Sequence, residues 1–217
     1  MARTLSDGDS SPGRAVSNAQ PKRRARGLKR QREILAAAEQ VFAKVGYQDA
    51  NTNLIADQAN CSPGTLYQFF QNKEQIAETI ANDYARELQA IQQAITEPSR
   101  YKTIEDAVDE VIDGNLKFLR TAPAFGVLLH ATHLGSPVRG TGPVLAHTIA
   151  ERIAALLKRH GPALSEADAY FHAEVCVRVF GGMLPLLQHA NARIRRRVAH
   201  ETKELAKRYL GPIVHGR

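Results

Sequence analysis

Helical periodicity over nearly the whole chain is the feature that most constrains its fold. From about residue 28 onward, apolar side chains recur every three or four residues, the spacing that places them on one face of an α-helix. No stretch of useful length alternates apolar and polar residues as a half-buried β-strand does. The sequence therefore predicts an all-α protein. The first apolar stripe consists of Ile34, Ala38, Val41, Phe42 and Val45.

Residues that start or stop helices divide this pattern into segments. Gly46 is expected to end the first helix, and Thr52 to cap the short helix that follows. Asn72 and Gln75 form a possible capping box, which predicts a long helix that ends before Pro98. Further helices are predicted over 103–119, 123–134, 143–160, 165–189 and 191–210.

Positive charge is concentrated at the N-terminal end. Residues 1–32 contain nine lysines and arginines and two acidic residues, whereas the rest of the chain carries 20 side chains of each sign. The net charge of +7 therefore belongs to this end. Such a segment is expected where a protein meets a polyanion, although a solubilising tail has the same composition.

Two short helices joined by a tight turn form the strongest functional pattern. The second helix starts at Ser62-Pro63, because serine caps helices and proline is accepted at the first helical position. Asn60 can adopt the left-handed backbone conformation of a tight turn. The arrangement predicts a helix-turn-helix, with Leu66 and Phe70 on the buried side of the second helix.

Gly64 lies inside this second helix, where glycine costs about 1 kcal/mol relative to alanine. A residue without a side chain lets backbone amides approach a phosphate or a base edge closely, so Gly64 is expected to face DNA. Beside it, Thr65 and Tyr67 can contact thymine methyls or phosphates. Gln68 can pair with adenine through both groups of its amide.

The run from Gly64 to Lys73 reads GTLYQFFQNK. It resembles the G-T-L-Y-x-x-F-x-N-K pattern of the TetR family of bacterial transcriptional regulators. The resemblance covers about residues 28–80, and the helical remainder fits the family in architecture. It implies a three-helix DNA-binding domain followed by a helical bundle that dimerises and encloses a small-molecule pocket. The residues expected to contact DNA are Thr52, Asn53, Ser62, Pro63, Gly64, Thr65, Tyr67, Gln68 and Lys73.

Three residues depart from the family pattern. Asn60 stands where glycine is common, and Cys61 replaces a common aliphatic residue. We interpret Cys61 as a packing residue, because buried cysteine behaves as a small hydrophobe, with a redox switch as the alternative. Phe69 stands where many relatives have tyrosine or histidine, and a phenyl ring cannot donate a hydrogen bond to phosphate.

The chain is expected to divide into a disordered basic arm (1–27), a helix-turn-helix domain (28–75) and a ligand-binding and dimerisation domain (76–217). The arm is rich in small polar residues at its start and basic at its end. It is expected to follow the DNA backbone or to enter a minor groove. Its DNA-contacting residues are expected to be Arg23, Arg24, Arg26, Lys29 and Arg30.

The C-terminal domain contains candidates for a dimer seam and a pocket. Gly181 and Gly182 permit close helix approach, so the last two helices are expected to form the seam, with packing inside a monomer as the alternative. The pocket is expected to include Phe118, Phe125, Leu129, His133, Phe171 and Val175, although plain core packing would use the same residues. His130 and His133 share a helix face but lack a further ligand at clear spacing, so no metal is assigned.

Enzymatic activity is not expected, because no nucleophile motif, phosphate-binding loop or dinucleotide fingerprint is present. The acidic cluster is interpreted as a solvated helix face, and the basic run over 193–197 as surface charge. The members of the acidic cluster are Glu105, Asp106, Asp109, Glu110 and Asp113.

A cytoplasmic location is expected, because the N-terminus is polar, no apolar run is long enough for a membrane helix, and Cys61 and Cys176 lie far apart. The sequence thus predicts a homodimeric repressor, without a cofactor, that binds a palindromic double-stranded DNA operator and is released by a small-molecule effector. The alternative is a small-molecule-binding or catalytic helical protein whose basic arm is incidental.

Overall fold

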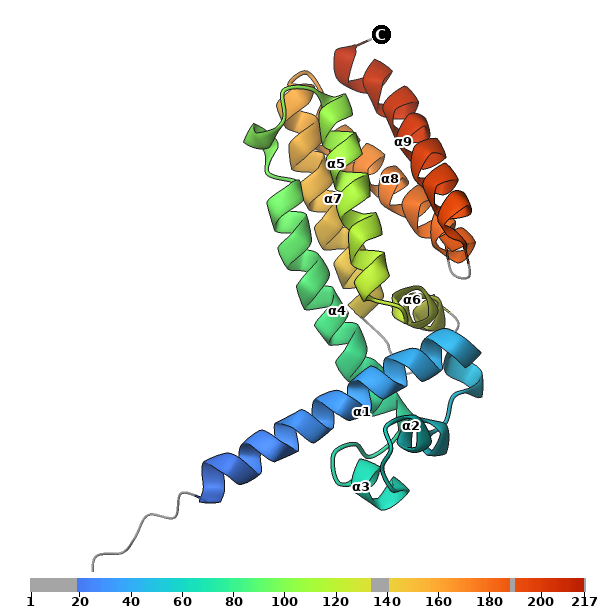
Figure 1. Ribbon diagram of the computed structural model, residues 1–217. Helices are drawn as coiled ribbons and strands as arrows, with labels where there is room; N and C mark the ends of the chain where they lie inside the picture. The colour runs from blue at the N-terminus through green and yellow to red at the C-terminus, as the bar shows by residue number, and fades with distance from the viewer. Residues whose placement is uncertain (1–18, 134–140, 188–189, 217) are drawn as a thin grey trace, which may run out of the picture.

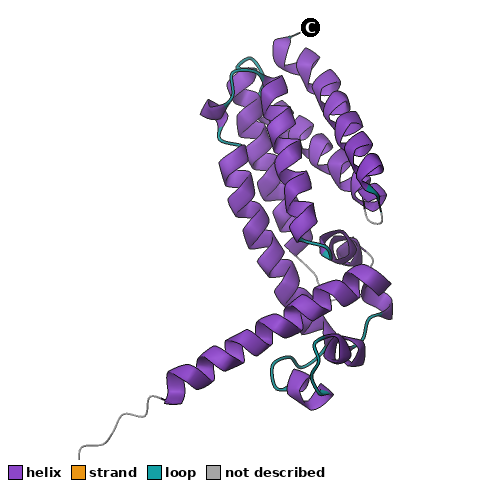
Figure 2. Ribbon diagram, viewed as in Figure 1, coloured by secondary structure: helices purple, strands orange, loops and turns teal. Residues whose placement is uncertain are grey.

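The computed structural model describes residues 19–133, 141–187 and 190–216. These residues form helices joined by short connections, with no strand among them (Figure 2). The all-α prediction is therefore confirmed. No helix within these ranges is both long and apolar enough to cross a membrane. The elements are α1 (Ala19–Asp49), α2 (Thr52–Gln58), α3 (Pro63–Tyr67), α4 (Lys73–Ile95), the 3-10 turn η1 (Pro98–Arg100), α5 (Ile104–Thr121), α6 (Phe125–His133), α7 (Thr141–His160), α8 (Glu166–Leu187) and α9 (Ala192–His215).

The helices form a small head and an elongated bundle (Figure 1). The head contains α1, α2, α3 and the start of α4, and the bundle contains the rest of α4 with α5, α7, α8 and α9. Helix α6 lies between the two parts and contacts both α1 and α4. The predicted domain boundary at residues 75 and 76 falls in the first turn of α4, where Ile76 and Ile80 are buried in the head's core. Other fully buried residues of that core are Ile34, Phe42, Ile55 and Leu66.

Side-chain caps set the helix starts that the sequence predicted. The Ser62 hydroxyl accepts a hydrogen bond from the Thr65 amide at 3.1 Å, and the Asn72 side chain accepts one from the Gln75 amide at 2.8 Å. The cap of α2 differs from the prediction: Asn51, not Thr52, accepts from the Leu54 amide at 2.9 Å. Both residue types are good caps, and the side chain one residue earlier is the one that reaches the free amide.

Helix α1 is longer than predicted. It begins at Ala19 rather than near residue 28, so residues 19–27 are helical and not part of a disordered arm. Alanine, lysine, arginine and glutamine favour helix strongly enough to offset Gly27, and a proline in the first turn is tolerated. Residues 1–18 of the predicted arm lie outside the described residues. Gly46, with φ 83°, interrupts the helix as predicted.

Three of the five acidic residues of α5 lie beside basic side chains of α9, which corrects their interpretation as part of a solvated face: Glu105, Asp109 and Asp113. Glu110 instead pairs with Arg100, and Asp106 is exposed. The Lys207 ammonium lies 2.7 Å from the Asp109 carboxylate, and the Lys203 ammonium lies 2.7 Å from that of Asp113. A hydrogen bond from Lys207 to Asp109 raises the pKa of this lysine. These pairs are partly exposed, so each contributes at most about 1 kcal/mol to stability.

Candidate nucleic-acid interface and internal cavity

The turn between α2 and α3 is built by local backbone bonds. Asn60 has φ 48°, the left-handed conformation that the sequence predicted for it. The Asn60 amide donates to the Asp57 carbonyl at 3.1 Å, and the Cys61 amide donates to the Ala56 carbonyl at 3.0 Å. The partly buried Cys61 side chain packs against the head's core. The turn therefore fixes the angle between α2 and α3.

Helix α3 presents one apolar and one polar face, as expected for the second helix of a helix-turn-helix. Leu66 and Phe70 are buried in the head, which confirms their predicted positions. The Tyr67 side chain is 52% exposed, and Gln68 is exposed beside it. The outer face of α3, which we define as Ser62, Pro63, Gly64, Thr65, Tyr67 and Gln68, is thus available to a partner.

Gly64 has open space where a side chain would be. A Cβ atom placed on it would have the Ser62 hydroxyl oxygen at 3.9 Å as its nearest neighbour outside the adjacent backbone, which is ordinary van der Waals contact. Its φ lies outside the left-handed region, so the backbone conformation does not require glycine either. Among the described residues, then, neither packing nor strain accounts for a glycine here.

Hydroxyl groups link the two short helices across this face. The Thr52 and Tyr67 hydroxyl oxygens are 3.0 Å apart, which joins the start of α2 to the end of α3. The Ser62 and Thr65 hydroxyl oxygens are also 3.0 Å apart. The bond to Thr52 holds the Tyr67 ring in a defined orientation on the outer face, while Asn53 is exposed beside Thr52.

Lys73 is bonded inside the head, although the sequence predicts that it contacts DNA. Its ammonium group donates to the Tyr47 and Gln48 carbonyls at 2.8 and 3.2 Å, and it lies 4.5 Å from the centre of the Tyr47 ring. Lys73 therefore ties the end of α1 to the start of α4. A phosphate contact by this group would have to be additional to these bonds.

The basic residues predicted for the arm lie on the first turns of α1. Figure 1 shows this end of α1 projecting beyond the rest of the head. Arg23, Arg24 and Arg26 are exposed there. The ammonium of Lys29 lies 3.9 Å, and the guanidinium of Arg30 2.9 Å, from the carboxylate of Glu33.

Phe69 packs toward this same part of α1. A Cβ atom on Gly27 would be 3.9 Å from the Phe69 ring, and the ring is partly buried against the head's core. The aromatic residue that departs from the family pattern is therefore a packing residue that supports α1. Its ring offers no group to a phosphate.

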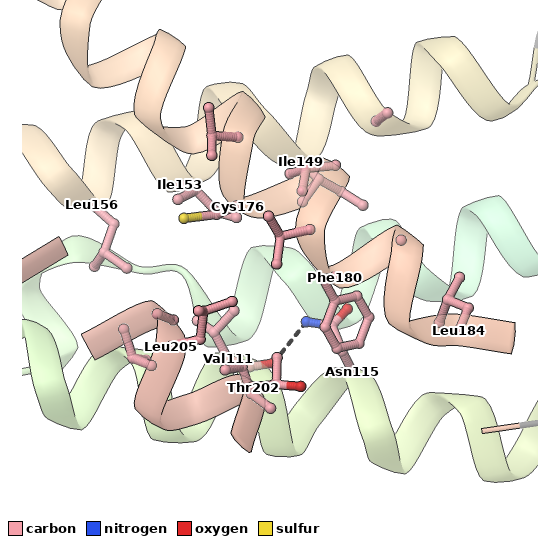
Figure 3. Close-up of a pocket in the computed structure, with 18 of the residues that line it drawn as sticks. Val111, Asn115, Ile149, Ile153, Leu156, Cys176, Phe180, Leu184, Thr202 and Leu205 are labelled. Atoms are coloured by element: carbon pink, nitrogen blue, oxygen red, sulfur yellow. Dashed lines mark hydrogen bonds between the residues drawn. The ribbon is translucent and has the colours of Figure 1, made fainter. Parts of the chain in front are cut away.

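The bundle encloses a cavity of about 290 Å³ between α5, α7, α8 and α9, with contributions from α4 and α6 (Figure 3). No residue in its lining is charged. Four lining residues carry polar side-chain groups, namely Asn115, Cys176, Thr202 and Tyr209. The other residues that line it are apolar or glycine.

The structure brings together some of the predicted pocket residues and not others. Phe118, Phe125, Leu129 and Val175 line the cavity. Phe171 does not, because it lies on the outer side of α8 with 60% of its surface exposed. The side chains of His130 and His133 lie outside the described residues. Among the described residues, no group of three or more His, Cys, Asp or Glu side chains is arranged to hold a metal ion.

Sequence reasoning missed the polar residues of the cavity. Asn115 follows Val111 and precedes Phe118 on the apolar stripe of α5, and Thr202 interrupts the corresponding stripe of α9. A polar residue in an apolar helix stripe was the available signal. Cys176 also lines the cavity, and burial raises the pKa of its thiol to about 11, so the group is neutral at physiological pH.

An aromatic cluster connects the cavity to the head. The rings of Phe118 and Phe125, both in the cavity lining, pack edge to face with centres 5.1 Å apart. Both also pack edge-on against Tyr84 of α4, at 6.0 and 6.1 Å. Tyr84 is buried beside Glu39 of α1, and burial raises the pKa of both groups. The side chains of Tyr84 and Glu39 therefore connect the phenylalanines of the cavity wall to α1.

Comparison with known protein families gives two matches, one for each part of the chain. Residues 34–80 match the family described as "Bacterial regulatory proteins, tetR family". Residues 103–210 match the family described as "Tetracyclin repressor-like, C-terminal domain". These families comprise DNA-binding regulators rather than enzymes, so the catalytic alternative is not supported.

Individual proteins resemble the chain in the same way. YhgD from Bacillus subtilis (strain 168), described as an uncharacterized HTH-type transcriptional regulator, is 35% identical over 72 residues, which is 33% of this chain and 38% of that relative. YvkB, with the same description and organism, is 33% identical over 73 residues and is also matched over 38% of its length. The chain thus matches little more than a third of the length of these relatives.

Solved structures extend the likeness to the whole fold. GusR of Salmonella enterica has a TM-score of 0.63 at 22% identity, covering 85% of this chain and 96% of that one. PfmR of Thermus thermophilus, a TetR family transcriptional regulator, has a TM-score of 0.64 at 20% identity, covering 84% and 97%. The likeness includes both the head and the bundle. This chain belongs to the TetR family of bacterial regulators.

Proposed function

We propose that this protein is a dimeric transcriptional repressor that binds a palindromic double-stranded DNA operator and releases it when a small molecule enters the cavity. The observation that carries the proposal is the open space at Gly64. Glycine is unfavourable in a helix, and no contact within the described chain requires one at this position. Close approach of the Gly64 backbone to a partner would explain why the residue is glycine. The site of action would be the cytoplasm, where DNA is available.

The outer face of α3 has the groups that a DNA major groove requires. Gln68 can form paired hydrogen bonds with adenine, and the exposed Tyr67 ring can lie against a thymine methyl. Thr52, Asn53, Ser62 and Thr65 supply hydroxyl and amide groups that suit phosphate oxygens. In this arrangement Lys73 supports the interface mainly by holding α1 and α4 together.

The projecting start of α1 adds positive charge to the same interface. Arg23, Arg24 and Arg26 are exposed there and have no acidic partner among the described residues. Contacts between such side chains and phosphates are independent of sequence and release counterions, so they make binding sensitive to salt. Lys29 and Arg30 would need to give up their exposed pairs with Glu33, which costs little.

Dimerisation is supported by apolar side chains left exposed on the last two helices. Phe171 and Leu186 of α8 are 60% and 57% exposed, and Ile194 and Leu205 of α9 are 46% and 47% exposed. Several large exposed hydrophobics on two adjacent helices are unusual for a monomer surface. A two-fold pairing of these helices would place two heads on the two halves of a palindrome.

The aromatic cluster supplies a route from effector to operator. A molecule that displaces Phe118 or Phe125 acts on Tyr84 and, through it, on α1 and α6. Release requires that the effector bind more tightly to the head spacing that does not fit DNA, because equal affinity for both arrangements shifts nothing.

The test is a matched pair of substitutions, Gly64→Leu and Ala90→Leu. Both add the same side chain at an exposed helical position, but only the first lies on the outer face of α3. Affinity for the DNA upstream of the protein's own coding sequence is measured by fluorescence anisotropy at fixed salt. We expect Gly64→Leu to weaken binding by at least about 100-fold, or about 2.8 kcal/mol, and Ala90→Leu to leave it unchanged. Equal binding by both variants would contradict the proposal.

A further inference from the structure

The cavity wall restricts the charge of any molecule that it accepts. None of its lining residues is ionised at neutral pH: the lining has no Asp, Glu, Lys, Arg or His, and the phenol of Tyr209 and the thiol of Cys176 both have a pKa raised by burial. A carboxylate, phosphate or ammonium group placed against this lining would lose its hydration without gaining an opposite charge from it. Such transfer is strongly unfavourable. The charged side chains of Glu174 and Arg178 line a neighbouring hollow that shares part of its wall with the cavity.

The orientation of Asn115 defines the polar point of the cavity. Its side-chain oxygen accepts a hydrogen bond from the Gln92 amide at 2.7 Å, and its nitrogen donates to the Val111 carbonyl at 2.7 Å (Figure 3). The Val111 carbonyl can only accept, so it fixes the amide nitrogen of Asn115 in this position. Gln92 is fully buried, and its own side-chain oxygen has no hydrogen-bond partner among the described residues. A side-chain amide nitrogen has two hydrogens, and the second has no acceptor among the described residues.

The other polar groups of the lining are largely occupied. The Thr202 hydroxyl donates to the Val198 carbonyl at 2.7 Å, so it has only lone pairs to offer. The Tyr209 hydroxyl pairs with a ring nitrogen of His172 at 2.7 Å. A thiol is a weak donor at most. Asn115 is therefore the main unused donor, and Thr202 an accompanying acceptor.

We propose that the effector is an uncharged, mainly apolar molecule with a hydrogen-bond-accepting group, such as a ketone, an ester or a hydroxyl, that receives a hydrogen bond from Asn115. The inference rests on the proposed function, since it names the ligand of the cavity assigned there to the effector. The volume of about 290 Å³ lies near the lower end of the range of about 300–1,000 Å³ for small-molecule sites, so the part of the molecule that this cavity holds is small.

Binding of a matched series to the full-length protein tests the charge of the ligand. Decane, 2-decanone, decanoate and decylammonium share a chain of similar length, and their affinities are measured by calorimetry at neutral pH. We expect 2-decanone to bind, and to bind at least about tenfold more tightly than decanoate or decylammonium. Tighter binding of either charged molecule, or no binding of 2-decanone, would overturn the inference.

Two substitutions test the polar contact. Asn115→Leu removes the donor at similar volume, and Thr202→Val removes the accompanying hydroxyl. We expect Asn115→Leu to weaken 2-decanone binding by about tenfold while decane binding is retained, whereas Val144→Ala, at a 61% exposed position of α7 outside the cavity lining, changes neither. An equal loss for decane and 2-decanone in Asn115→Leu would show that the amide acts only through packing, and would overturn the assignment.

Operator affinity is measured on the same preparations. This measurement tests the proposed regulatory function independently of the inferred ligand class. A protein that binds its operator but prefers decanoate retains the proposed regulatory function and loses the inferred ligand class. A protein that binds 2-decanone through Asn115 but does not bind its operator retains the ligand class and loses the regulatory function.

Discussion

The head and the bundle expose their polar groups in opposite ways. On the head, the outer face of α3 turns hydroxyl and amide groups outward around the open space at Gly64. In the bundle, the cavity wall has no charged residue, and Asn115 and Thr202 direct hydrogen bonds to the protein's own carbonyls. A surface that meets a hydrated polyanion needs free polar groups, whereas a cavity that extracts an apolar molecule from water must have few.

Helix α4 and the aromatic cluster nevertheless connect the two regions. Helix α4 contributes Ile76 and Ile80 to the head and Leu88 to the cavity lining. Tyr84 lies between these positions and contacts the two phenylalanines of the cavity wall. The comparison therefore predicts that substitutions at the junction affect both regions, while substitutions within one region leave the other intact.

The largest effect on stability is expected at the junction. Phe118 is 2% exposed, and Phe118→Ala would remove a ring that packs against Tyr84 and Phe125. The free energy of unfolding is expected to fall by about 3–5 kcal/mol, measured by urea denaturation. Val144→Ala is the control, because this side chain is 61% exposed, lies outside the proposed dimer seam, and its loss is expected to change little. If both variants lose a similar amount of unfolding free energy, the junction does not contribute more to stability than an exposed position.

Replacing Arg23, Arg24 and Arg26 with glutamine should act on the head alone. If all three contact phosphates, the slope of log affinity against log salt concentration is expected to decrease in magnitude by about 2.7. The measurement is operator affinity over a salt series, with 2-decanone affinity as the reference for the bundle. An unchanged slope would exclude this end of α1 from the interface.

Tyr67→Phe tests whether orientation of one ring matters on the outer face of α3. The variant keeps the ring and loses the hydroxyl that bonds to Thr52. Operator affinity is expected to fall by about 0.5–1.5 kcal/mol, the usual net value of one hydrogen bond. Tyr67→Ala should cost more, since it removes the ring as well. If Tyr67→Phe binds as tightly as the native protein, the bond to Thr52 has no role in recognition.

The smallest effect is expected at the ion pairs between α5 and α9. Lys207→Met removes a partly exposed pair with Asp109, so the loss of stability should be at most about 1 kcal/mol. Since the pKa of Lys207 is raised in the folded state, the contribution is fully present below the unfolded pKa of about 10.4 and is lost as pH rises through the folded value. The difference in unfolding free energy between native protein and variant should therefore be the same at pH 7 as at pH 9. A difference that changes between these pH values would point to another cause.

The sequence predicted the head well because its signals are local. The caps at Ser62 and Asn72, the left-handed Asn60 and the buried Leu66 all depend on residues a few positions away. The bonds of Lys73 inside the head were not predicted, because its partners, the carbonyls of Tyr47 and Gln48, are more than 20 residues upstream, and its contact with DNA stays a prediction. The predicted start of α1 followed the beginning of the apolar period, whereas residues 19–27 form helix without a large apolar side chain.

The bundle was predicted as a class of structure but not in detail. Its cavity is lined by residues from six helices, and periodicity shows only that each helix has an apolar face. Phe171 has the spacing of a core residue but lies on the outer surface. Conversely, the acidic cluster has the composition of a solvated face, but its members Asp109 and Asp113 pair with lysines of α9. Which face meets which neighbour depends on tertiary packing.

Hydrogen exchange in the presence of operator DNA tests the central claim most directly. Backbone amides of Ser62 and of residues 64–68 are compared in the free protein, with operator, and with a scrambled duplex of equal length at the same salt concentration. The account predicts strong protection of this segment by operator alone, because the backbone at Gly64 enters the groove. Protection confined to the start of α1, or equal protection by both duplexes, would contradict it.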